Sequence, residues 1–275
     1  MANTQVLKLI RAVDEAASPD QLIKAVRALS QSGTEAVIPT LITVLGYNNP
    51  GASVAAVEGL VKLDSVAVPF LLEQIQENTN YSARAWAIRA LAGIGDPQGL
   101  ETLLTAAIDD FSMSVRRAAA RGLGILRWQM LVPEKLISGQ EQALGVLFQA
   151  VEKDPEWVVR YAAVVGLQEF AAAVFVRHPN WLIKIQNQLG QIAQADANLA
   201  VKTRALLAQQ RIQPSLEEIQ LKIADVDATE SNHWQLTLER LYSRKAQERC
   251  QEEGNPYKFR AVAAAIQDML GEQTR

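Results

Sequence analysis

Three arginines and two aromatic residues are the side chains in this sequence best suited to bind a ligand. They are Trp86, Arg89, Arg117, Arg121 and Tyr161. Guanidinium groups form paired hydrogen bonds with carboxylates, and the faces of aromatic rings bind flat conjugated molecules. The five side chains could therefore hold a flat ligand that carries carboxylates. Alternatively, they belong to a solvated helix surface that includes two aromatic residues by chance.

A second set of arginines recurs at a fixed offset, which is typical of a structural role. Arg84, Arg116 and Arg160 each stand seven residues before a leucine. Asp110 stands six residues before Arg116, and Asp154 stands six residues before Arg160. A hydrogen-bond ladder between repeats needs the same residue types in every repeat. We therefore predict that these five residues form a ladder that ties each repeat to the next.

The sequence offers few residues for metal binding or for catalysis by a nucleophile of its own. His178 and His233 are the two histidines, and neither belongs to a metal-ligand motif. No P-loop, dinucleotide-binding or nucleophile-elbow motif occurs in the sequence. Cys250 is the single cysteine, which we interpret as an ordinary helix residue, with a nucleophile or transient ligand carrier as the alternative. We expect no metal ion and no resident cofactor.

An internal repeat places the candidate residues. Its copies are anchored by leucines that lie 31, 31, 32 and 44 residues apart, namely Leu29, Leu60, Leu91, Leu123 and Leu167. Apolar residues recur at intervals of three and four, and strand signals are almost absent. Repeats of this length are typical of solenoids. The predicted fold class is therefore all-α, with helix pairs stacked in a superhelix.

Each repeat is predicted to contain two helices, of which the second is rich in alanine. The first helix is exemplified by residues 35–45 and 66–75, and the second ends at the anchoring leucine. Positions two and six before that leucine face away from the core, on the side that lines the concave surface of such arrays. Arg89, Arg117, Arg121 and Tyr161 occupy these positions, so we expect them on one inner wall, beside Trp86.

The regular pattern changes at two places. The longest interval contains an insertion at residues 127–142, which we expect to extend a second helix and to add a loop. The repeat array is placed at residues 1–212, with its strongest copies at 24–171, and further helices are expected at 213–275, the first from Pro214. Their apolar stripes could cap the array or bind a partner, and they comprise Trp234, Leu238, Leu241, Phe259, Val262 and Ile266.

Composition limits the possible partners and the compartment. The chain has 275 residues, 27 Lys and Arg, and 30 Asp and Glu, for a net charge of −3. This balance argues against nucleic-acid binding through general basicity. No signal-peptide pattern is present at the amino terminus, and the apolar run at 171–176 is far shorter than a membrane span. We expect a soluble cytoplasmic protein without a membrane span.

Four segments of the chain resemble a known family. They read VLGYNNPGASVAAVEGL, YSARAWAIRALAGIGDP, SVRRAAARGLGILRW and DPEWVVRYAAVVGLQ, and together they fall within residues 24–171. These segments resemble the HEAT-like repeats of phycobilisome lyases. The resemblance is specifically to the E-type, or alpha, subunit of the heterodimeric E/F bilin lyase that acts on the phycocyanin alpha subunit. It implies a HEAT-like repeat solenoid and an F-type partner subunit.

The resemblance also implies an enzymatic activity. With an F-type partner, members of this family attach phycocyanobilin through a thioether to a cysteine of the phycocyanin alpha apoprotein. The bilin is then a substrate, and the acceptor thiol belongs to the apoprotein, so this chain needs no nucleophile. On this basis Arg89, Arg117 or Arg121 would hold the propionates, and Trp86 or Tyr161 would support the tetrapyrrole.

The resemblance assigns no catalytic residue and leaves several roles open. A carboxylate such as that of Asp110 could accept hydrogen bonds from pyrrole N–H groups, although we expect it in the ladder. The C-terminal stripes would bind the F-type partner. One alternative is the E-type subunit of the isomerising phycoerythrocyanin lyase. Another is an adaptor that recruits the apoprotein and leaves all bilin contact to its partner.

Overall fold

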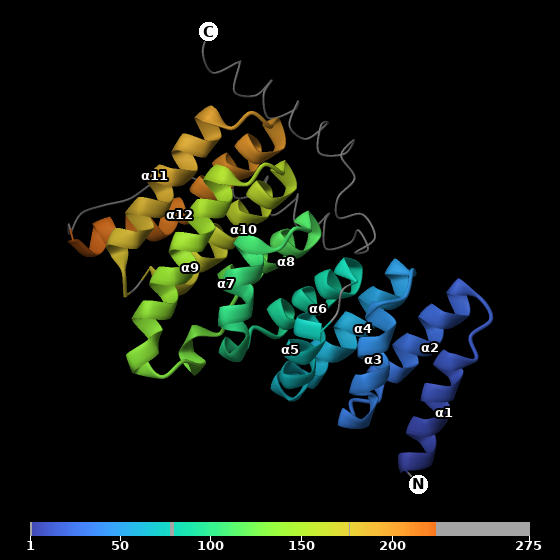
Figure 1. The fold of residues 1–275 in the computed structure, drawn as a ribbon. Coiled ribbons are helices and arrows are strands. Elements are labelled where there is room, and N and C mark those ends of the chain that lie inside the picture. The colour runs from blue at the N-terminus through green and yellow to red at the C-terminus, as the bar shows by residue number, and fades with distance from the viewer. Residues whose placement is uncertain (1, 78–79, 176, 224–275) are drawn as a thin grey trace.

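The computed structural model describes residues 2–77, 80–175 and 177–223, and these residues form helices joined by turns, with no strand among them (Figure 1). The first helices of the repeats are α1 (Ala2–Asp14), α3 (Ile38–Leu45), α5 (Val68–Glu77), α7 (Leu100–Asp109), α9 (Pro133–Lys153) and α11 (Pro179–Ala195). The second helices are α2 (Pro19–Gln31), α4 (Pro50–Leu63), α6 (Tyr81–Ile94), α8 (Met113–Gly124), α10 (Trp157–Val174) and α12 (Leu199–Ile223). The predicted all-α solenoid is confirmed.

The helices form two layers that follow a curved row (Figure 1). The second helices pack against one another in chain order, from α2 through α4, α6, α8 and α10 to α12. The first helices contact their own repeat partners extensively and contact one another less. In a curved stack, the more closely spaced layer lies on the inside of the curve. The even-numbered helices therefore form the inner layer.

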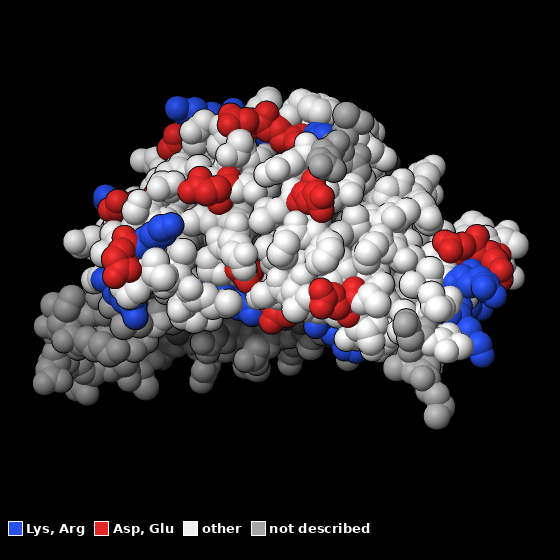
Figure 2. Space-filling view, turned by 60° about the horizontal axis from the view of Figure 1, so that its bottom comes forward, with Lys and Arg blue, Asp and Glu red and all other residues white. Residues whose placement is uncertain are grey.

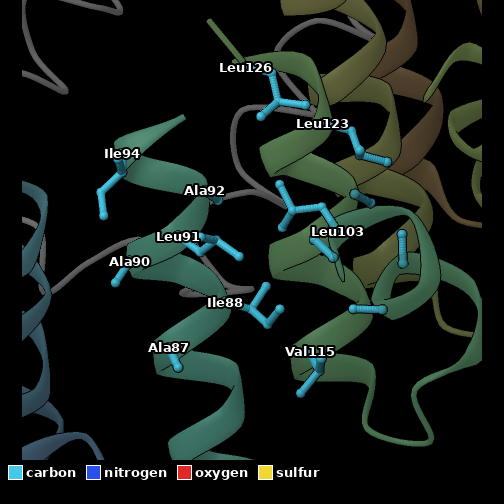
Figure 3. Close-up of a cluster of buried hydrophobic side chains, with 14 of the residues drawn as sticks. Ala87, Ile88, Ala90, Leu91, Ala92, Ile94, Leu103, Val115, Leu123 and Leu126 are labelled. Atoms are coloured by element: carbon cyan, nitrogen blue, oxygen red, sulfur yellow. The ribbon is translucent and has the colours of Figure 1, made fainter. Parts of the chain in front are cut away.

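The anchoring leucines of the predicted repeat lie in the core. All five are fully buried, namely Leu29, Leu60, Leu91, Leu123 and Leu167. Figure 3 shows one such region, where Ile88 and Leu91 of α6 lie near Leu103 of α7 and Leu123 of α8. Burying an apolar side chain of this size stabilises the fold by about 1.5–3 kcal/mol. The repeat period therefore corresponds to one buried leucine per unit, and each unit adds its leucine to a continuous core.

Small residues allow the inner helices α8 and α10 to touch. A Cβ atom added to Gly124 would overlap the backbone carbonyl of Gly166, and one added to Gly166 would overlap the carbonyl oxygen of Ala120. Ala119 of α8 and Ala163 of α10 are also fully buried. Side chains larger than these would hold the two helices apart. The alanine-rich composition of the second helices thus fixes the spacing of the inner layer.

Polar side chains cap the starts of several helices. Side-chain oxygens of Ser18, Asn49 and Asp96 accept backbone N–H bonds at 3.2, 3.1 and 2.9 Å. Such bonds satisfy N–H groups that have no partner within the helix. Asp154 stands three residues before α10, which begins at Trp157, and its carboxylate accepts the backbone N–H of Glu156 at 2.9 Å and pairs with an arginine of the preceding repeat.

The expectation that the insertion extends a second helix is wrong. Helix α8 ends at Gly124, a short 3₁₀ turn follows at Trp128–Met130, and α9 starts at Pro133. Proline is favoured at a helix start because its missing N–H has no partner there. The inserted residues therefore lengthen a first helix, which has 21 residues in α9 and 10 in α7. Trp128 is buried and packs edge-on against the ring of Phe170.

The helix start expected at Pro214 is also wrong, because α12 continues through this proline to Ile223. A proline inside a helix removes one backbone hydrogen bond and crowds the carbonyl four residues earlier. That carbonyl belongs to Gln210, which is exposed, so water can hydrogen-bond to it in place of the missing N–H. The division between residues 212 and 213 stays a prediction. The other C-terminal helices, with their apolar stripes, lie outside the described residues.

Helix α10 is long and apolar enough to cross a membrane by length and composition. Its 18 residues have a mean hydropathy of 1.2, and 56% of them are buried. It packs against α8 and α12 in the inner layer and also contacts α9 and α11. Its apolar composition is therefore explained by the four helices that pack around it.

Candidate functional site

Three neighbouring inner helices carry the five predicted ligand-binding residues. Trp86 and Arg89 lie on α6, Arg117 and Arg121 on α8, and Tyr161 on α10. Arg117 and Arg121 are exposed, and the other three are half-buried. Because α6 packs against α8 and α8 against α10, these positions form adjacent columns of one surface. We call this surface the inner wall. Its role as a ligand site stays a prediction.

Arg89 and Trp86 form a defined pair within the inner wall. The central carbon of the Arg89 guanidinium lies 5.4 Å from the centre of the Trp86 ring. Residues three apart on a helix are neighbours, and a cation over an indole face is attracted by the ring electrons. The pair therefore presents a positive charge beside an aromatic plane before any ligand binds.

A polar chain that the sequence analysis did not foresee continues the inner layer toward α12. The buried Arg204 donates to Oε1 of Gln168 at 3.0 Å, and Nε2 of Gln168 donates to Glu169 at 3.1 Å. No sequence signal could have indicated Glu169, because the equivalent position 44 residues earlier is Ile125. These hydrogen bonds hold the Glu169 carboxylate on α10, the helix that also carries Tyr161.

Two cavities among the described residues are too small, or too distant from the inner wall, to enclose a large pigment there. One cavity, of about 90 Å³, is lined by residues that include Gln168, Glu169 and Arg211. Another, of about 380 Å³, lies between α11 and α12 and is lined by residues that include Gln186 and Gln209. Enclosed ligand sites usually have about 300–1,000 Å³. A ligand on the inner wall would therefore lie along an open surface.

Three ion pairs connect consecutive repeats. They join Arg84 to Asp110, Arg116 to Asp154, and Arg160 to Asp196. In each pair Nε and Nη2 of the arginine donate to the two carboxylate oxygens, at distances from 2.6 to 3.1 Å. The aspartate always precedes the second helix of the next repeat. Asp196 was not foreseen, although it stands 42 residues after Asp154 and so near the repeat spacing.

Each carboxylate in this ladder accepts hydrogen bonds through both of its oxygens. Asp110 accepts from Arg84 through both oxygens and also accepts the backbone N–H of Ser112 at 2.8 Å. The backbone carbonyl of Asp110 accepts from Arg116 at 2.9 Å. The alternative role of Asp110, as an acceptor for a pyrrole N–H, therefore finds no support. In the next pair, the hydrogen bond to Asp154 raises the pKa of Arg116 above its ordinary value.

Surface charge is mixed. On the face shown in Figure 2, Asp and Glu side chains are scattered over a largely neutral surface, and Lys and Arg lie mainly toward its margins. Among the described residues, no group of three or more His, Cys, Asp or Glu could hold a metal ion. His178 stacks on Trp181 with ring centres 4.0 Å apart. His233 and Cys250 lie outside the residues that the structure describes.

The curved stack of helix pairs, with its inter-repeat ion pairs and its exposed inner wall, defines an α-solenoid of the HEAT-repeat class. Models of two families match the chain, HEAT repeats over residues 68–168 and the PBS lyase HEAT-like repeat over residues 22–47. The chain is also 48% identical to "Phycocyanobilin lyase subunit beta" of Pseudanabaena tenuis, over 94% of this chain and 96% of that protein. The chain belongs to the family of phycocyanobilin lyase subunits.

Two further proteins support this membership. The chain is 51% identical to "Phycocyanin alpha phycocyanobilin lyase CpcF" of a Synechocystis species, over 61% of this chain and 77% of that protein. A solved structure, "the complex of CpcE and CpcF of phycocyanin lyase" from a Nostoc species, contains a chain that is 46% identical. The TM-score is 0.58, and the match covers 64% of this chain and 99% of that chain.

The E-type assignment expected from the sequence is not supported. The most extensive of these matches is to a protein named as a beta subunit, and the Synechocystis protein is named CpcF. The four segments behind the resemblance are rich in alanine, glycine and leucine at packing positions. Such residues determine how repeat helices fit together and carry little information about which subunit they build.

Proposed function

We propose that this chain is the beta, or F-type, subunit of a heterodimeric bilin lyase. With an alpha, or E-type, partner it attaches phycocyanobilin through a thioether to a cysteine of the phycocyanin alpha apoprotein, in the cytoplasm. The similarity to a phycocyanobilin lyase beta subunit along 94% of this chain supports the subunit type. The solved complex of CpcE and CpcF supports a heterodimer. The bilin is a substrate of this activity.

The reaction requires positioning more than it requires a nucleophile. The apoprotein thiolate adds to the exocyclic ethylidene group of the bilin, which forms a carbon–sulfur bond, opens the double bond and leaves the pigment to take up a proton. The sulfur comes from the apoprotein, so the lyase must hold a flexible pigment with one face toward that sulfur. No residue of this chain is assigned to the proton transfer.

The inner wall is the surface of this chain that suits the pigment. Arg117 and Arg121 are exposed and one turn apart on α8, where they can form paired hydrogen bonds with the two propionates. Trp86, with Arg89 over its ring, and Tyr161 offer aromatic faces on the neighbouring helices. The observation that carries the proposal is this concentration of cations and aromatic rings in a chain with a net charge of −3.

A reconstitution with the alpha partner, the apoprotein and phycocyanobilin tests the proposal. The double variant Arg117→Ala, Arg121→Ala should transfer pigment at least tenfold more slowly, because each lost charged hydrogen bond costs about 1.5–3 kcal/mol. The control variant Lys135→Ala, Lys184→Ala removes two exposed cations from α9 and α11 and should leave transfer unchanged. Helicity and heterodimer formation should be the same in all three proteins.

Two results would contradict the proposal. Undiminished transfer by the Arg117 and Arg121 double variant would remove the inner wall from the pigment site. An absence of any bilin absorbance change on mixing with this chain, alone and with its partner, would favour an adaptor that recruits the apoprotein. The absorbance of the product distinguishes phycocyanobilin attachment from the isomerising reaction.

A further inference from the structure

Glu169 is the one acidic residue in the three helices of the inner wall. Besides it, the charged residues of α6, α8 and α10 are all arginines, namely Arg84, Arg89, Arg116, Arg117, Arg121 and Arg160. On α10, Glu169 stands eight residues after Tyr161, with Val165 midway between them. Residues four apart are neighbours on one face of a helix, so Glu169 continues the face of Tyr161.

Hydrogen bonds from the interior determine how the Glu169 side chain is presented. The amide of Gln168 lies between Arg204 and Glu169, and Arg204 and Gln168 are only 7% and 8% exposed. A guanidinium has donors only, so the amide oxygen of Gln168 faces Arg204 and its NH2 group faces Glu169. Glu169 accepts from this NH2 group at 3.1 Å. A buried arginine thus fixes Glu169 as a hydrogen-bond acceptor.

The Glu169 carboxylate has acceptor positions left for a ligand. In the described part of the chain it accepts one side-chain hydrogen bond, from Gln168 to Oε1. A carboxylate offers about four acceptor positions on its two oxygens. Glu169 is half-buried and lines the cavity of about 90 Å³, together with Arg211 of α12. The cavity is too small for a pigment but leaves the carboxylate reachable from the surface.

Glu169 lies close to the place where α8 and α10 touch. Gly166, three residues before Glu169, leaves no room for a Cβ atom against the carbonyl of Ala120 on α8. The exposed Arg121 is the next residue after Ala120. Packed helices are about 8–10 Å apart, so a ligand as wide as two helices can meet a cation of α8 and the carboxylate of α10 together.

The pigment carries one kind of group for each of these helices. In its two central rings the propionate and the nitrogen lie on opposite sides of the ring, so propionates held by Arg117 and Arg121 direct the ring nitrogens toward a neighbouring helix. We propose that Glu169 accepts hydrogen bonds from the ring N–H groups and so binds the protonated, cationic form of the pigment. The inference rests on the proposed lyase function and adds a specific contact to it.

The charge balance of the addition gives this contact a role in the reaction. The apoprotein thiolate brings one negative charge, the carbon–sulfur bond forms, and the electron pair of the opened double bond enters the conjugated rings. In the cationic pigment these rings already carry the proton that neutralises that pair, so the thioether product is neutral. A carboxylate within about 4–6 Å of a cation favours the charged form of that cation. Glu169 therefore increases the fraction of the pigment that is ready to react.

The absorbance of phycocyanobilin bound to the purified heterodimer, followed as the pH is varied without apoprotein, tests the inference. Glu169→Gln keeps an oxygen for the hydrogen bond from Gln168 but removes the charge, so the apparent pKa of the bound pigment should fall by at least about one pH unit. Glu169→Asp retains the charge and should recover part of this shift. The control Glu152→Gln removes a carboxylate that also accepts from a glutamine amide, that of Gln188 at 2.8 Å, but lies on the outer helix α9. It should leave the pKa of the pigment unchanged.

Pigment transfer to the apoprotein gives a second readout. Glu169→Gln should move the pH profile of transfer to lower pH by the same amount, and should slow transfer by about tenfold where the pigment is mostly unprotonated. An unchanged pigment pKa in Glu169→Gln, or no recovery in Glu169→Asp, would overturn the inference and leave the lyase proposal intact. If the wild-type heterodimer does not alter the bilin absorbance at all, the lyase proposal fails and the inference fails with it.

Discussion

Each arginine of the inter-repeat ladder connects its own repeat to an aspartate of the next repeat. Arg116 pairs with Asp154 of the next repeat and also donates to the backbone carbonyls of Asp110 and Phe111 in its own loop. The side chains of Arg116 and Asp154 are 11% and 6% exposed. A guanidinium suits this role because its planar set of donors can satisfy a carboxylate and two carbonyls together. Neither a lysine nor an apolar residue can reproduce that geometry.

Replacing Arg116 by methionine should lower the free energy of unfolding by about 3 kcal/mol. The variant leaves the nearly buried Asp154 carboxylate without its cation, and an unpaired buried charge is costly. Urea denaturation measures the change. Arg11→Met is the control, because Arg11 is exposed on α1 and its loss should matter by less than about 0.5 kcal/mol. Equal stability of the two variants would show that the ladder adds nothing.

Asp196 should make the stability of the protein depend on acid pH. Burial acts to raise the pKa of its carboxyl, but hydrogen bonds from Arg160 and from the backbone N–H of Asn198 outweigh burial and hold that pKa below its ordinary value. A folded pKa below the unfolded value means that the stabilisation is complete above the unfolded pKa, about 3.9. It is lost as the pH falls through the folded pKa.

The matching experiment compares the wild type with Asp196→Asn. The variant should be less stable at neutral pH, and its free energy of unfolding should fall less than that of the wild type between about pH 5 and pH 2. Urea midpoints measured across this range give both quantities. Parallel pH profiles for the two proteins would exclude Asp196 as a source of the acid sensitivity.

At the scale of helices, the spacing of α8 and α10 depends on two glycines. Gly124→Ala should destabilise the protein by at least about 2 kcal/mol, because the new Cβ atom meets the backbone of Gly166, which cannot move aside. Gly145→Ala is the matched control. No atom lies within 4 Å of a Cβ built at Gly145 inside α9, so this change should stabilise the helix by about 0.5–1 kcal/mol. Thermal unfolding should show shifts of opposite sign, and two shifts of the same sign would contradict the packing account.

The elements that the sequence predicted well are those with a repeated signal. The buried leucines Leu29 to Leu167 could be placed because the same core position recurs in every unit. The insertion at 127–142 occurs once, and nothing in its sequence distinguishes a longer second helix from a longer first helix. The deciding feature is the end of α8 at Gly124, where this helix lies against α10.

The helices that carry the candidate residues were predictable, and the surroundings of each side chain were not. Arg89, Arg117 and Tyr161 lie on the second helices as their register predicted, and Arg117 is exposed. Tyr161 was expected away from the core, but it is half-buried and packs against it. The contact of Arg89 with Trp86 depends on side-chain rotamers. The hydrogen bonds that link Arg204, Gln168 and Glu169 join side chains that no repeated sequence pattern indicates as partners. Asp196 was missed because it follows Asp154 by 42 residues, and not by the 44 that separate Asp110 from Asp154.

At the scale of the whole molecule, the stacking of the helices brings side chains from separate repeats onto one surface. Each inner helix contributes one or two side chains, and only the stacking of α6, α8 and α10 brings them onto the inner wall. A curved solenoid presents such a surface without enclosing it. The cavity lined by Gln168 and Glu169 has only about 90 Å³, so a pigment of the proposed kind would lie along the open surface.

The binding of phycocyanobilin by the purified heterodimer, without apoprotein, tests the central claim most directly. Titration followed by bilin absorbance gives a dissociation constant for the wild type, for the Arg117→Ala, Arg121→Ala variant and for the Lys135→Ala, Lys184→Ala control. The account predicts that the inner-wall variant binds at least about tenfold more weakly, a loss of about 1.4 kcal/mol, and that the control binds like the wild type. Equal affinity of all three proteins for the bilin would contradict it.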